Sequence, residues 1–315
     1  MSRRTRRSFI VGTRTSKLAR RQTALVIACL MWACPDVLIR VRSFSTSGDR
    51  SPDRPLGDFS DPGVFTSDIE RAMLSGEIDF AVHSFKDLPI DEMPGLTVAA
   101  VPDRADVRDV LVTSRGRTLA MLPRGATVGT SSLSRTWQLR ALRPDLIVRP
   151  IRGNVGVRVQ KVLAGEYDAT ILATAGLQRL GLEDSISDWF SIDEITPSPA
   201  QAALAVQCRQ DDNELLEMLR QIDRPRHRLS VVAERTFLRE LGGGQAAPVG
   251  AVASRIPGTP DFQLFGKVVS DDGRTAVRVE GIGNDPVILG RNLARKALTC
   301  GAKNLLNTHA DSAAP

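Results

Sequence analysis

Apolar side chains stand at every second position from Ile78 to Val82, inside the stretch GEIDFAVHSFKDLP that runs from Gly76 to Pro89. This two-residue period predicts a buried strand, and the proline at the end of the stretch cannot continue a strand ladder. Lys86 and Asp87 then lie at the carboxyl end of the strand. Because ligands of open α/β sheets bind beyond the carboxyl ends of the strands, both residues are candidates for a functional site. An aspartate at such a place is also a common turn or capping residue, so its surroundings decide between the two interpretations.

The same order of segments occurs twice along the chain. Ser8 to Thr13 (SFIVGT) predicts a strand, and a helix is expected from about Lys17 to Trp32. Val128 to Gln138 (VGTSSLSRTWQ) repeats this unit, and the strand stretch GEIDFAV (76–82) is matched by GEYDATI (165–171). A strand that runs directly into a helix leaves free backbone N–H groups at the turn, where an anion can bind. The repeat therefore predicts two similar α/β lobes.

The order of predicted elements divides the chain into three parts. We expect lobe 1 to hold residues 1–104 with 198–222, lobe 2 to hold residues 105–197, and a C-terminal α+β domain to hold residues 223–315. Lobe 2 is predicted to have strands near Val128, Ile147 and Ile171 with helices between them. The run Thr196 to Arg209, TPSPAQAALAVQCR, is predicted to start a helix after two prolines and to return to lobe 1.

The C-terminal region has a different pattern of helices and strands. It predicts a helix at Leu229–Leu241 and a glycine break at Gly242–Gly244. Three strands are expected near Val249–Ala253, Phe262–Val269 and Thr275–Gly281, followed by a final helix at Pro286–Leu306. This order is typical of a small α+β domain.

Length and composition place the chain among ordinary globular proteins. Its 315 residues are too many for one ordinary core, and the hydrophobic and charged fractions of 42% and 25% are those of a soluble protein. The formal charge is +6, and only six of the 42 basic residues are lysines, which leaves 36 arginines. An arginine-rich genome would give this bias, and so would recognition of carboxylates or phosphates by bidentate guanidinium groups.

Several functional classes are disfavoured by the sequence. Acidic residues are interspersed throughout and aromatic residues make up 4%, which gives little support to nucleic-acid binding. The triple glycine at 242–244 is followed by no GK[ST] motif. The four cysteines form no CxxC pair and the three histidines are scattered, so we expect no metal site and a reducing cytoplasmic location. The longest apolar run, Ala24 to Cys34, is too short to span a bilayer, and the arginine pair in TRRSFI precedes no apolar signal region.

Basic and hydroxyl side chains gather at the predicted ends of the strands and helices. They are Arg14, Ser16, Lys86, Ser131, Ser132, Arg135, Arg152, Arg158 and Arg179, and Asp87 is the carboxylate among them. Guanidinium groups and helix N-termini would together bind a small ligand that carries several carboxylates or phosphates. Asp87 would then serve a cationic or N–H group of the ligand. Each arginine taken alone is more often a surface residue, so the prediction rests on their shared position at element ends.

The segments VGTRTSKLARRQ, GEIDFAVHSFKDLP, VGTSSLSRTWQLRALRPDLIVRPIRGNVGVRVQK, EYDATILATAGLQRLGL and ERTFLRELGGG resemble the porphobilinogen deaminase (hydroxymethylbilane synthase) family, from about Ile10 to Leu306. The resemblance implies an α/β fold of three domains, with two lobes like those of type II periplasmic binding proteins, a cleft, and a small α+β C-terminal domain. It also implies a transferase that joins porphobilinogen units head to tail with loss of ammonia. A small-molecule substrate, no nucleic-acid or membrane partner and a monomer are expected.

The resemblance also implies roles for individual residues. The catalytic aspartate of the family falls on Asp87, and Phe65 matches a phenylalanine near the growing pyrrole chain. The full predicted substrate-binding set is Arg14, Ser16, Phe65, Ser84, Lys86, Ser131, Ser132, Arg135, Arg152, Arg158 and Arg179. An anion beside the pyrrole would stabilise the azafulvenium cation that forms when ammonia leaves.

The chain departs from the family pattern where the family holds its dipyrromethane primer. The segment LGGGQAAPVG has Gln245 at the position of the primer-attaching cysteine, and an amide cannot form the thioether. The other departures are Asp58 and Pro62 at loop lysine positions, Ser134 in place of an arginine, and Ala200 and Ala202 in place of the glycines that flank Gln201.

These departures lead us to expect no cofactor and a short, dipyrrole-type product. Two alternatives remain open: an ordinary hydroxymethylbilane synthase that retains its primer in another way, and a non-catalytic binder of porphobilinogen or linear pyrroles. Cys208 is the nearest other thiol, and its sequence context predicts a core residue.

Overall fold

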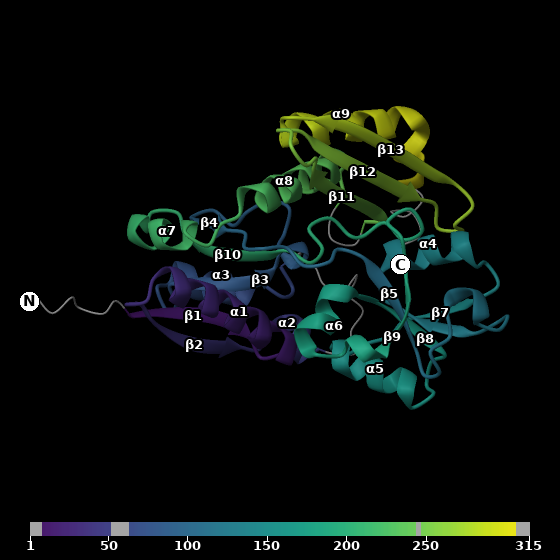
Figure 1. The fold of residues 1–315 in the computed structure, drawn as a ribbon, viewed down its shortest axis with the longest axis horizontal. Coiled ribbons are helices and arrows are strands. Elements are labelled where there is room, and N and C mark those ends of the chain that lie inside the picture. The colour runs from purple at the N-terminus through teal and green to yellow at the C-terminus, as the bar shows by residue number, and fades with distance from the viewer. Residues whose placement is uncertain (1–7, 52–62, 244–246, 307–315) are drawn as a thin grey trace, which may run out of the picture. The chain divides into compact units, whose positions relative to one another are not determined.

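A computed structural model describes residues 8–51, 63–243 and 247–306. The chain divides into two compact units, the first formed by Met1–Arg104 with Ala203–Arg228 and the second by Ala105–Ala202 with Leu229–Pro315. The first unit contains one five-stranded sheet, and the second contains a five-stranded and a three-stranded sheet (Figure 1). The predicted α/β fold, with two sheet-containing lobes and a small C-terminal sheet domain, is therefore confirmed. The predicted residue boundaries of the three domains stay predictions.

The sheet of the first unit places the Lys86–Asp87 turn at a strand end. Its strand order is β2-β1-β3-β10-β4, with bounds Leu38–Phe44, Ser8–Arg14, Phe80–Ser84, Leu204–Arg209 and Leu96–Ala100. Strands β1, β2 and β3 are parallel, and β10 is antiparallel to both of its neighbours. The short 3-10 helix η2 (Phe85–Asp87) follows β3 directly. The strand predicted from the alternating pattern is thus confirmed, and Asp87 lies just beyond its carboxyl end.

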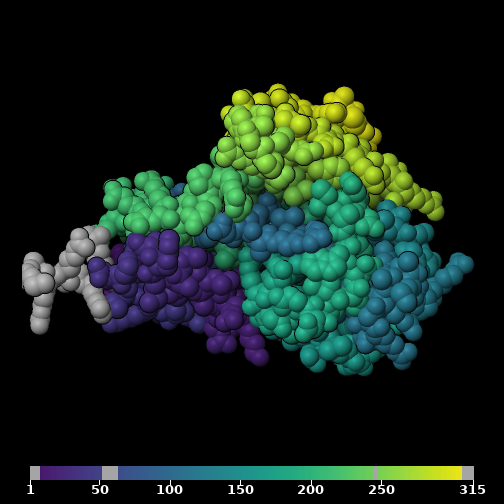
Figure 2. Space-filling view, viewed as in Figure 1, coloured from purple at the N-terminus to yellow at the C-terminus, as the bar shows by residue number. Residues whose placement is uncertain are grey.

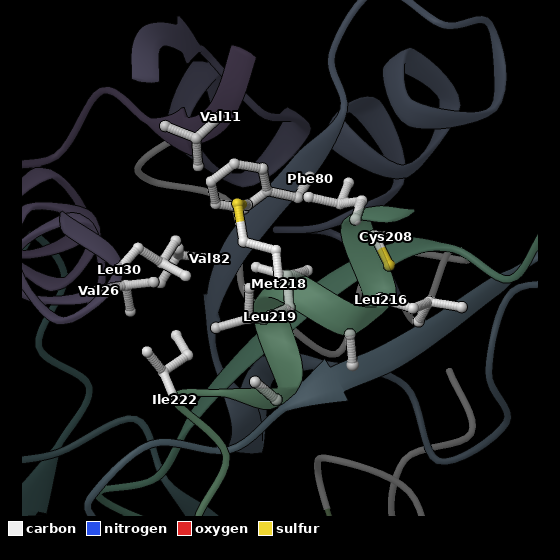
Figure 3. Close-up of a cluster of buried hydrophobic side chains, with 14 of the residues drawn as sticks. Val11, Val26, Leu30, Phe80, Val82, Cys208, Leu216, Met218, Leu219 and Ile222 are labelled. Carbon is white, nitrogen blue, oxygen red and sulfur yellow. The ribbon is translucent and has the colours of Figure 1, made fainter. Parts of the chain in front are cut away.

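Helices cover both faces of this sheet. They are α1 (Lys17–Ala33), α2 (Ser47–Arg50), α3 (Ser67–Leu74) and α7 (Asn213–Arg220). On one face Leu30 of α1 and Leu219 of α7 pack with Val11 and Phe80 in a fully buried cluster (Figure 3). On the other face Ile69 of α3 and its neighbours form a second buried cluster. Cover on both faces explains why the inner strands β3 and β10 are buried at nearly every position.

The second unit repeats this arrangement. Its large sheet has the order β7-β6-β8-β5-β9, with bounds Ile147–Arg149, Thr127–Gly129, Ala169–Ala173, Asp109–Thr113 and Ile186–Trp189. Its helices are α4 (Leu133–Leu142), α5 (Val155–Leu163) and α6 (Thr174–Leu180), with short 3-10 turns η3 (Leu119–Met121) and η4 (Glu183–Ser185). Strands β6, β7 and β8 are parallel and β5 is antiparallel, the same order of directions as in the first unit. The internal repeat seen in the sequence is therefore a repeat of topology.

The glycine of each VGT motif has a packing role. A Cβ added at Gly12 would lie 2.3 Å from the Ile78 Cδ1 atom, and one added at Gly129 would lie 2.9 Å from the Ile151 Cδ1 atom. In both strands the side chain of a following segment packs directly against the backbone. Only glycine leaves room for this approach, which explains why the motif recurs in both lobes.

The helix predicted within Thr196 to Arg209 is wrong. Residues 204–209 of that stretch form β10, and the structure has no helix between residues 196 and 203. Strand β10 lies between β3 and β4 and is buried on both faces, so its apolar positions do not alternate. Periodicity cannot separate a short run of this kind from a buried helix. The predicted return of this segment to lobe 1 is confirmed.

The C-terminal part follows the predicted order of elements. It comprises α8 (Pro225–Glu240), β11 (Val249–Arg255), β12 (Phe262–Val269), β13 (Ala276–Gly283), α9 (Pro286–Ala297) and η5 (Leu298–Ala302). The three strands are antiparallel, and α9 packs on the sheet through contacts with β13 (Figure 1). Asp285 is the N-cap of α9, and its carboxylate accepts hydrogen bonds from the Val287 and Ile288 amides. The yellow C-terminal segment forms part of the molecular surface (Figure 2).

No helix within the described ranges is both long enough and apolar enough to cross a membrane.

Candidate active site

The Lys86–Asp87 turn is held by the backbone on either side. The Phe85 amide donates to the Ala203 carbonyl over 3.0 Å, and the Leu88 amide donates to the Phe85 carbonyl over 3.2 Å. The side chains of Phe85 and Leu88 are buried, whereas those of Lys86 and Asp87 are half-buried. The turn is therefore fixed from within, and the two charged side chains lie between the two apolar anchors.

Two of the predicted serines have structural partners in the first unit. Ser16 is the N-cap of α1, where its hydroxyl accepts a hydrogen bond from the Ala19 amide. The Ser84 hydroxyl accepts from Gln22 Nε2 over 2.9 Å and lies 3.3 Å from Gln22 Oε1. Both side chains are therefore oriented at the ends of β1 and β3, and their contact with substrate stays a prediction.

Arg14 lies at the end of β1 between an acidic and an aromatic partner. Its Nη2 and Nε atoms donate to Asp49 over 2.5 and 3.2 Å, and its guanidinium carbon lies 4.1 Å from the centre of the Phe65 ring. Asp49 also accepts hydrogen bonds from the amide and the hydroxyl of Thr46. Burial opposes the charged form of Asp49, but the hydrogen bonds and charge of Arg14, helped by Thr46, lower its pKa overall. The structure thus brings Arg14 and Phe65 together, as expected of two residues near one substrate.

In the second unit the hydroxyl groups of the VGTSS turn are also engaged. The Ser131 hydroxyl donates to the Ile151 carbonyl over 2.8 Å and accepts from the Ile151 amide over 3.2 Å. Ser132 is the N-cap of α4 and accepts from the Arg135 amide. These contacts join the turn after β6 to the segment after β7, which is followed by Arg152.

Arg135 is buried in a bidentate ion pair. Its Nε and Nη2 atoms donate to the two carboxylate oxygens of Asp109 over 3.0 and 2.7 Å, and its Nη1 atom donates to the Ile171 carbonyl. Nη2 also lies 3.4 Å from Gln201 Oε1. The side chain of Arg135 is 10% exposed and that of Asp109 is 2% exposed, so the pair is removed from solvent. The resemblance assigned Arg135 to a substrate acid, whereas in this structure its fork is occupied by Asp109.

Arg158 and Arg179 are half-buried arginines whose charges are not neutralised by a carboxylate among the described residues. Burial, and then the charges of Arg135 and Arg152, lower the pKa of Arg158 to about 10, and burial alone lowers the pKa of Arg179 to about 10. Arg158 donates to the Gly153 carbonyl and Arg179 to the Ala202 carbonyl. Among the described residues neither guanidinium has a carboxylate partner. Removing a cation from water without a counter-ion is unfavourable, so such groups are typical of a site that receives an anion.

We call Arg135, Arg152, Arg158 and Arg179 the arginine cluster. The charges of Arg135 and Arg152 both act on Arg158. Arg179 donates to the carbonyl of Ala202, and the neighbouring residue Gln201 contacts Arg135. The cluster lies wholly within the second unit. It was predicted from element ends alone, and it could bind several carboxylates.

The sequence analysis missed the residues that hold these arginines. Asp49 and Asp109 lie in no recognisable motif. Gln201 was named only because alanines replace the glycines that flank it in the family. A search for acidic residues at strand starts would have singled out Asp109, the first residue of β5. Its partner Arg135 lies 26 residues further along the chain, and no local pattern links the two.

The chemistry of the Cys208 thiol does not fit covalent attachment of a primer. Cys208 is fully buried in the first core, as predicted, and burial, with the Asp212 charge, raises its pKa to about 12. Such a thiol supplies no thiolate at neutral pH. Gln245, Asp58 and Pro62 lie outside the described residues. Within the described ranges no three histidine, cysteine or acidic side chains are grouped as metal ligands.

Two α/β lobes of matched topology, followed by a small antiparallel sheet with its helices, define the class of protein to which this chain belongs. Family models for "Porphobilinogen deaminase, dipyromethane cofactor binding domain" and "Porphobilinogen deaminase, C-terminal domain" match residues 9–217 and 228–299. The chain belongs to the porphobilinogen deaminase family, a family of transferases, and the resemblance read from the motifs is confirmed.

Named relatives agree with this assignment over nearly the whole chain. Porphobilinogen deaminase of Roseiflexus sp. (strain RS-1) is 46% identical over 96% of this chain and 99% of its own length. The corresponding protein of Brevibacillus brevis is 42% identical over 94% of this chain and 96% of its own length. A solved structure of the Bordetella pertussis BvgS VFT2 domain matches 68% of this chain and 86% of that chain, with 15% identity and a TM-score of 0.42.

Proposed function

We propose that the chain condenses porphobilinogen units head to tail with release of ammonia. The observation that carries this proposal is that the half-buried guanidinium groups of Arg158 and Arg179 have no carboxylate partners among the described residues, and that Arg158 lies near Arg152. Porphobilinogen carries an acetate and a propionate group, which suit bidentate guanidinium groups. The same observation supports binding of the linear pyrroles that the reaction forms, because each added ring brings two more carboxylates.

The reaction assigns Asp87 to the step in which charge develops. Breaking the bond between the methylene carbon and the ammonium nitrogen sends the electron pair out with ammonia and leaves an azafulvenium cation. A fixed carboxylate stabilises that cation, which is the role of Asp87. The free α-carbon of an acceptor pyrrole then forms the new C–C bond and afterwards loses its proton. Asp87 is also the group that can assist this proton transfer.

We further propose that the protein works without a covalently bound dipyrromethane. Attachment requires a nucleophile that captures the first azafulvenium, and the amide nitrogen of Gln245 has a delocalised lone pair. The buried thiol of Cys208 cannot replace it. A second free monomer then serves as the acceptor, and the product is a short, dipyrrole-type chain.

The experiment that tests the proposal is incubation of the purified full-length chain with porphobilinogen, followed by an ammonia assay and mass analysis of protein and products. We expect ammonia release, a short linear pyrrole, the intact mass of the bare polypeptide and no protein-bound colour with Ehrlich's reagent. An added mass of two pyrrole units that survives denaturation would instead show ordinary hydroxymethylbilane synthesis with another attachment residue. Calorimetric binding without ammonia release would show a non-catalytic pyrrole binder.

A further inference from the structure

Gln201 lies between two alanines that have a left-handed backbone. Ala200 has a φ of 63° and Ala202 a φ of 69°, and both residues are buried. Residues other than glycine seldom adopt this conformation because the Cβ approaches the backbone closely. Strain of this kind persists only where surrounding contacts fix the segment, and it is concentrated at functional sites.

The contacts that fix the segment come from three directions within the second unit. The Ala200 amide donates to Glu234 Oε2 over 2.7 Å, and Glu234 Oε1 accepts from the Ala253 amide of β11 over 2.7 Å. The Gln201 amide donates to the Ser198 carbonyl over 3.0 Å, which closes the turn. Helix α8 and strand β11 therefore anchor the backbone just before Gln201.

The Gln201 side chain extends from this anchored turn to the buried ion pair. Its Nε2 atom donates to Asp109 Oδ1 over 2.7 Å and to the Val107 carbonyl over 2.7 Å, while its Oε1 atom accepts from Arg135. Gln201 is fully buried, so water is not at hand to replace these hydrogen bonds. One amide thus contacts both members of the Asp109–Arg135 pair.

The next peptide contacts the other end of the arginine cluster. The Ala202 carbonyl accepts from Arg179 Nη2 over 2.6 Å, and the left-handed φ of Ala202 sets the direction of that carbonyl. Gln201 and Ala202 together therefore fix two guanidinium groups that come from different elements, Arg135 from α4 and Arg179 from α6.

We propose that Gln201 is a positioning residue for the arginine cluster, holding Arg135 on Asp109 and setting the peptide that orients Arg179. This inference rests on the proposed function, since it assigns the cluster to the carboxylates of porphobilinogen. The Asp109 carboxylate offsets part of the positive charge that Arg135 brings to the cluster. Holding Arg179 in place reduces the freedom that this side chain would lose when an anion binds. Gln201 contacts the arginines and not the reacting atoms.

The kinetic test compares Gln201→Met with Gln138→Met. Gln138 is an equally buried glutamine of the same unit, and it bonds to Ser134 and Thr196 instead of the arginine cluster. With porphobilinogen as substrate, we expect Gln201→Met to raise KM about tenfold and to change kcat less than twofold, because hydrogen bonds to charged groups are lost without loss of Asp87. Gln138→Met should leave KM within about twofold. Equal KM values for Gln201→Met and the parent, or equal effects of both variants, would overturn the positioning role.

A second variant keeps the inference testable if the Gln201→Met protein does not fold. Gln201→Glu keeps the size and the acceptor for Arg135, but it cannot donate to Asp109 and adds a negative charge. We expect its KM to rise more than tenfold at pH 8. An unchanged KM in this variant would also overturn the inference.

A substrate-free measurement separates failure of this inference from failure of the proposed function. In ¹⁵N-labelled protein the Arg135 Nε–H signal, identified by its loss in Arg135→Lys, should exchange slowly with water. Gln201→Met should speed that exchange at least about tenfold, whereas Gln138→Met should not. If the parent protein neither binds nor converts porphobilinogen, the proposed function fails, and this exchange result alone decides whether Gln201 positions Arg135. Unchanged exchange in Gln201→Met would overturn the inference even in an active enzyme.

Discussion

Arg14 and Asp49 form a two-point ion pair at the end of β1, with N–O distances of 2.5 and 3.2 Å. The carboxylate therefore competes with any substrate acid for this guanidinium. Replacing Asp49 by Asn keeps an acceptor for Thr46 and removes the competing charge. We expect porphobilinogen to bind about three- to tenfold more tightly, as measured by calorimetry at low salt.

The matched control for this change is Asp79→Asn. Asp79 also pairs with an arginine of the first unit, Arg209, so the variant has the same net charge. It should bind porphobilinogen like the parent. Weaker binding in Asp49→Asn would contradict the prediction and would show that Asp49 is needed to orient Arg14.

Asp87→Asn should lower the rate of ammonia release about a hundredfold to a thousandfold, because the amide keeps the shape but not the charge that stabilises the azafulvenium cation. Binding of porphobilinogen should stay within about threefold of the parent. Glu92→Gln, an exposed change of equal charge close along the chain, serves as the control. Turnover of Asp87→Asn near the parental rate would exclude Asp87 as the catalytic carboxylate.

Lysine substitution separates charge from geometry in the arginine cluster. Arg152→Lys and Arg158→Lys keep the positive charge and lose the bidentate fork, so each should weaken porphobilinogen binding about tenfold. The control is Arg149→Lys, because Arg149 is exposed at the end of β7. Calorimetric affinities that are equal in all three variants would mean that Arg152 and Arg158 do not contact the ligand.

Ala200→Gly and Ala202→Gly should each stabilise the protein. Relief of the left-handed strain is worth about 1–2 kcal/mol, and the extra freedom of glycine in the unfolded chain offsets about 0.5–1 kcal/mol of it. The net gain of about 0.5–1 kcal/mol should appear as a higher urea midpoint. Ala203→Gly, at a buried neighbour without a positive φ, should instead lower the midpoint.

The buried imidazole of His83 should make stability depend on pH. Burial, and then the Arg14 charge, lower its pKa to about 4, against a partial opposing effect of Gln207. In the unfolded chain the group binds a proton from about pH 6.5 downward, while the folded chain does not. The folded state should therefore lose up to about 3 kcal/mol as pH falls from 6.5 to 4. Urea titrations at several pH values measure this loss of stability, which should be smaller in His83→Asn than in the parent protein. An equal loss in the variant and the parent would contradict the assignment to His83.

Local patterns were sufficient for the parts of the fold that depend on neighbouring residues. The alternation before Asp87 located β3, and the two VGT motifs located the strand and helix that start each lobe. The sequence also placed Arg158 and Arg179 at the ends of elements, and the structure has them in the first turns of α5 and the last turn of α6. Their contact with a ligand stays a prediction.

Features that depend on tertiary contacts could not be predicted from local sequence patterns. The Asp109–Arg135–Gln201 contacts span 26 and 66 residues, so no window of sequence contains them. The stretch before β10 was assigned to a helix because two prolines precede it, whereas contacts with Glu234 and Arg179 hold Ala200 and Ala202 in a left-handed turn. The positions at which local preference failed are the ones that hold the arginine cluster.

The placement of β10 sets an order for assembly during synthesis. All strands of the second unit's large sheet fall between residues 109 and 189, whereas the first sheet needs residues 204–209 to join β3 to β4. On the ribosome the second lobe can close while the first still exposes two unpaired strand edges. A nascent chain stalled within the second lobe would therefore present those edges to chaperones or to other nascent chains, and early termination codons there should give aggregates and not a stable first lobe.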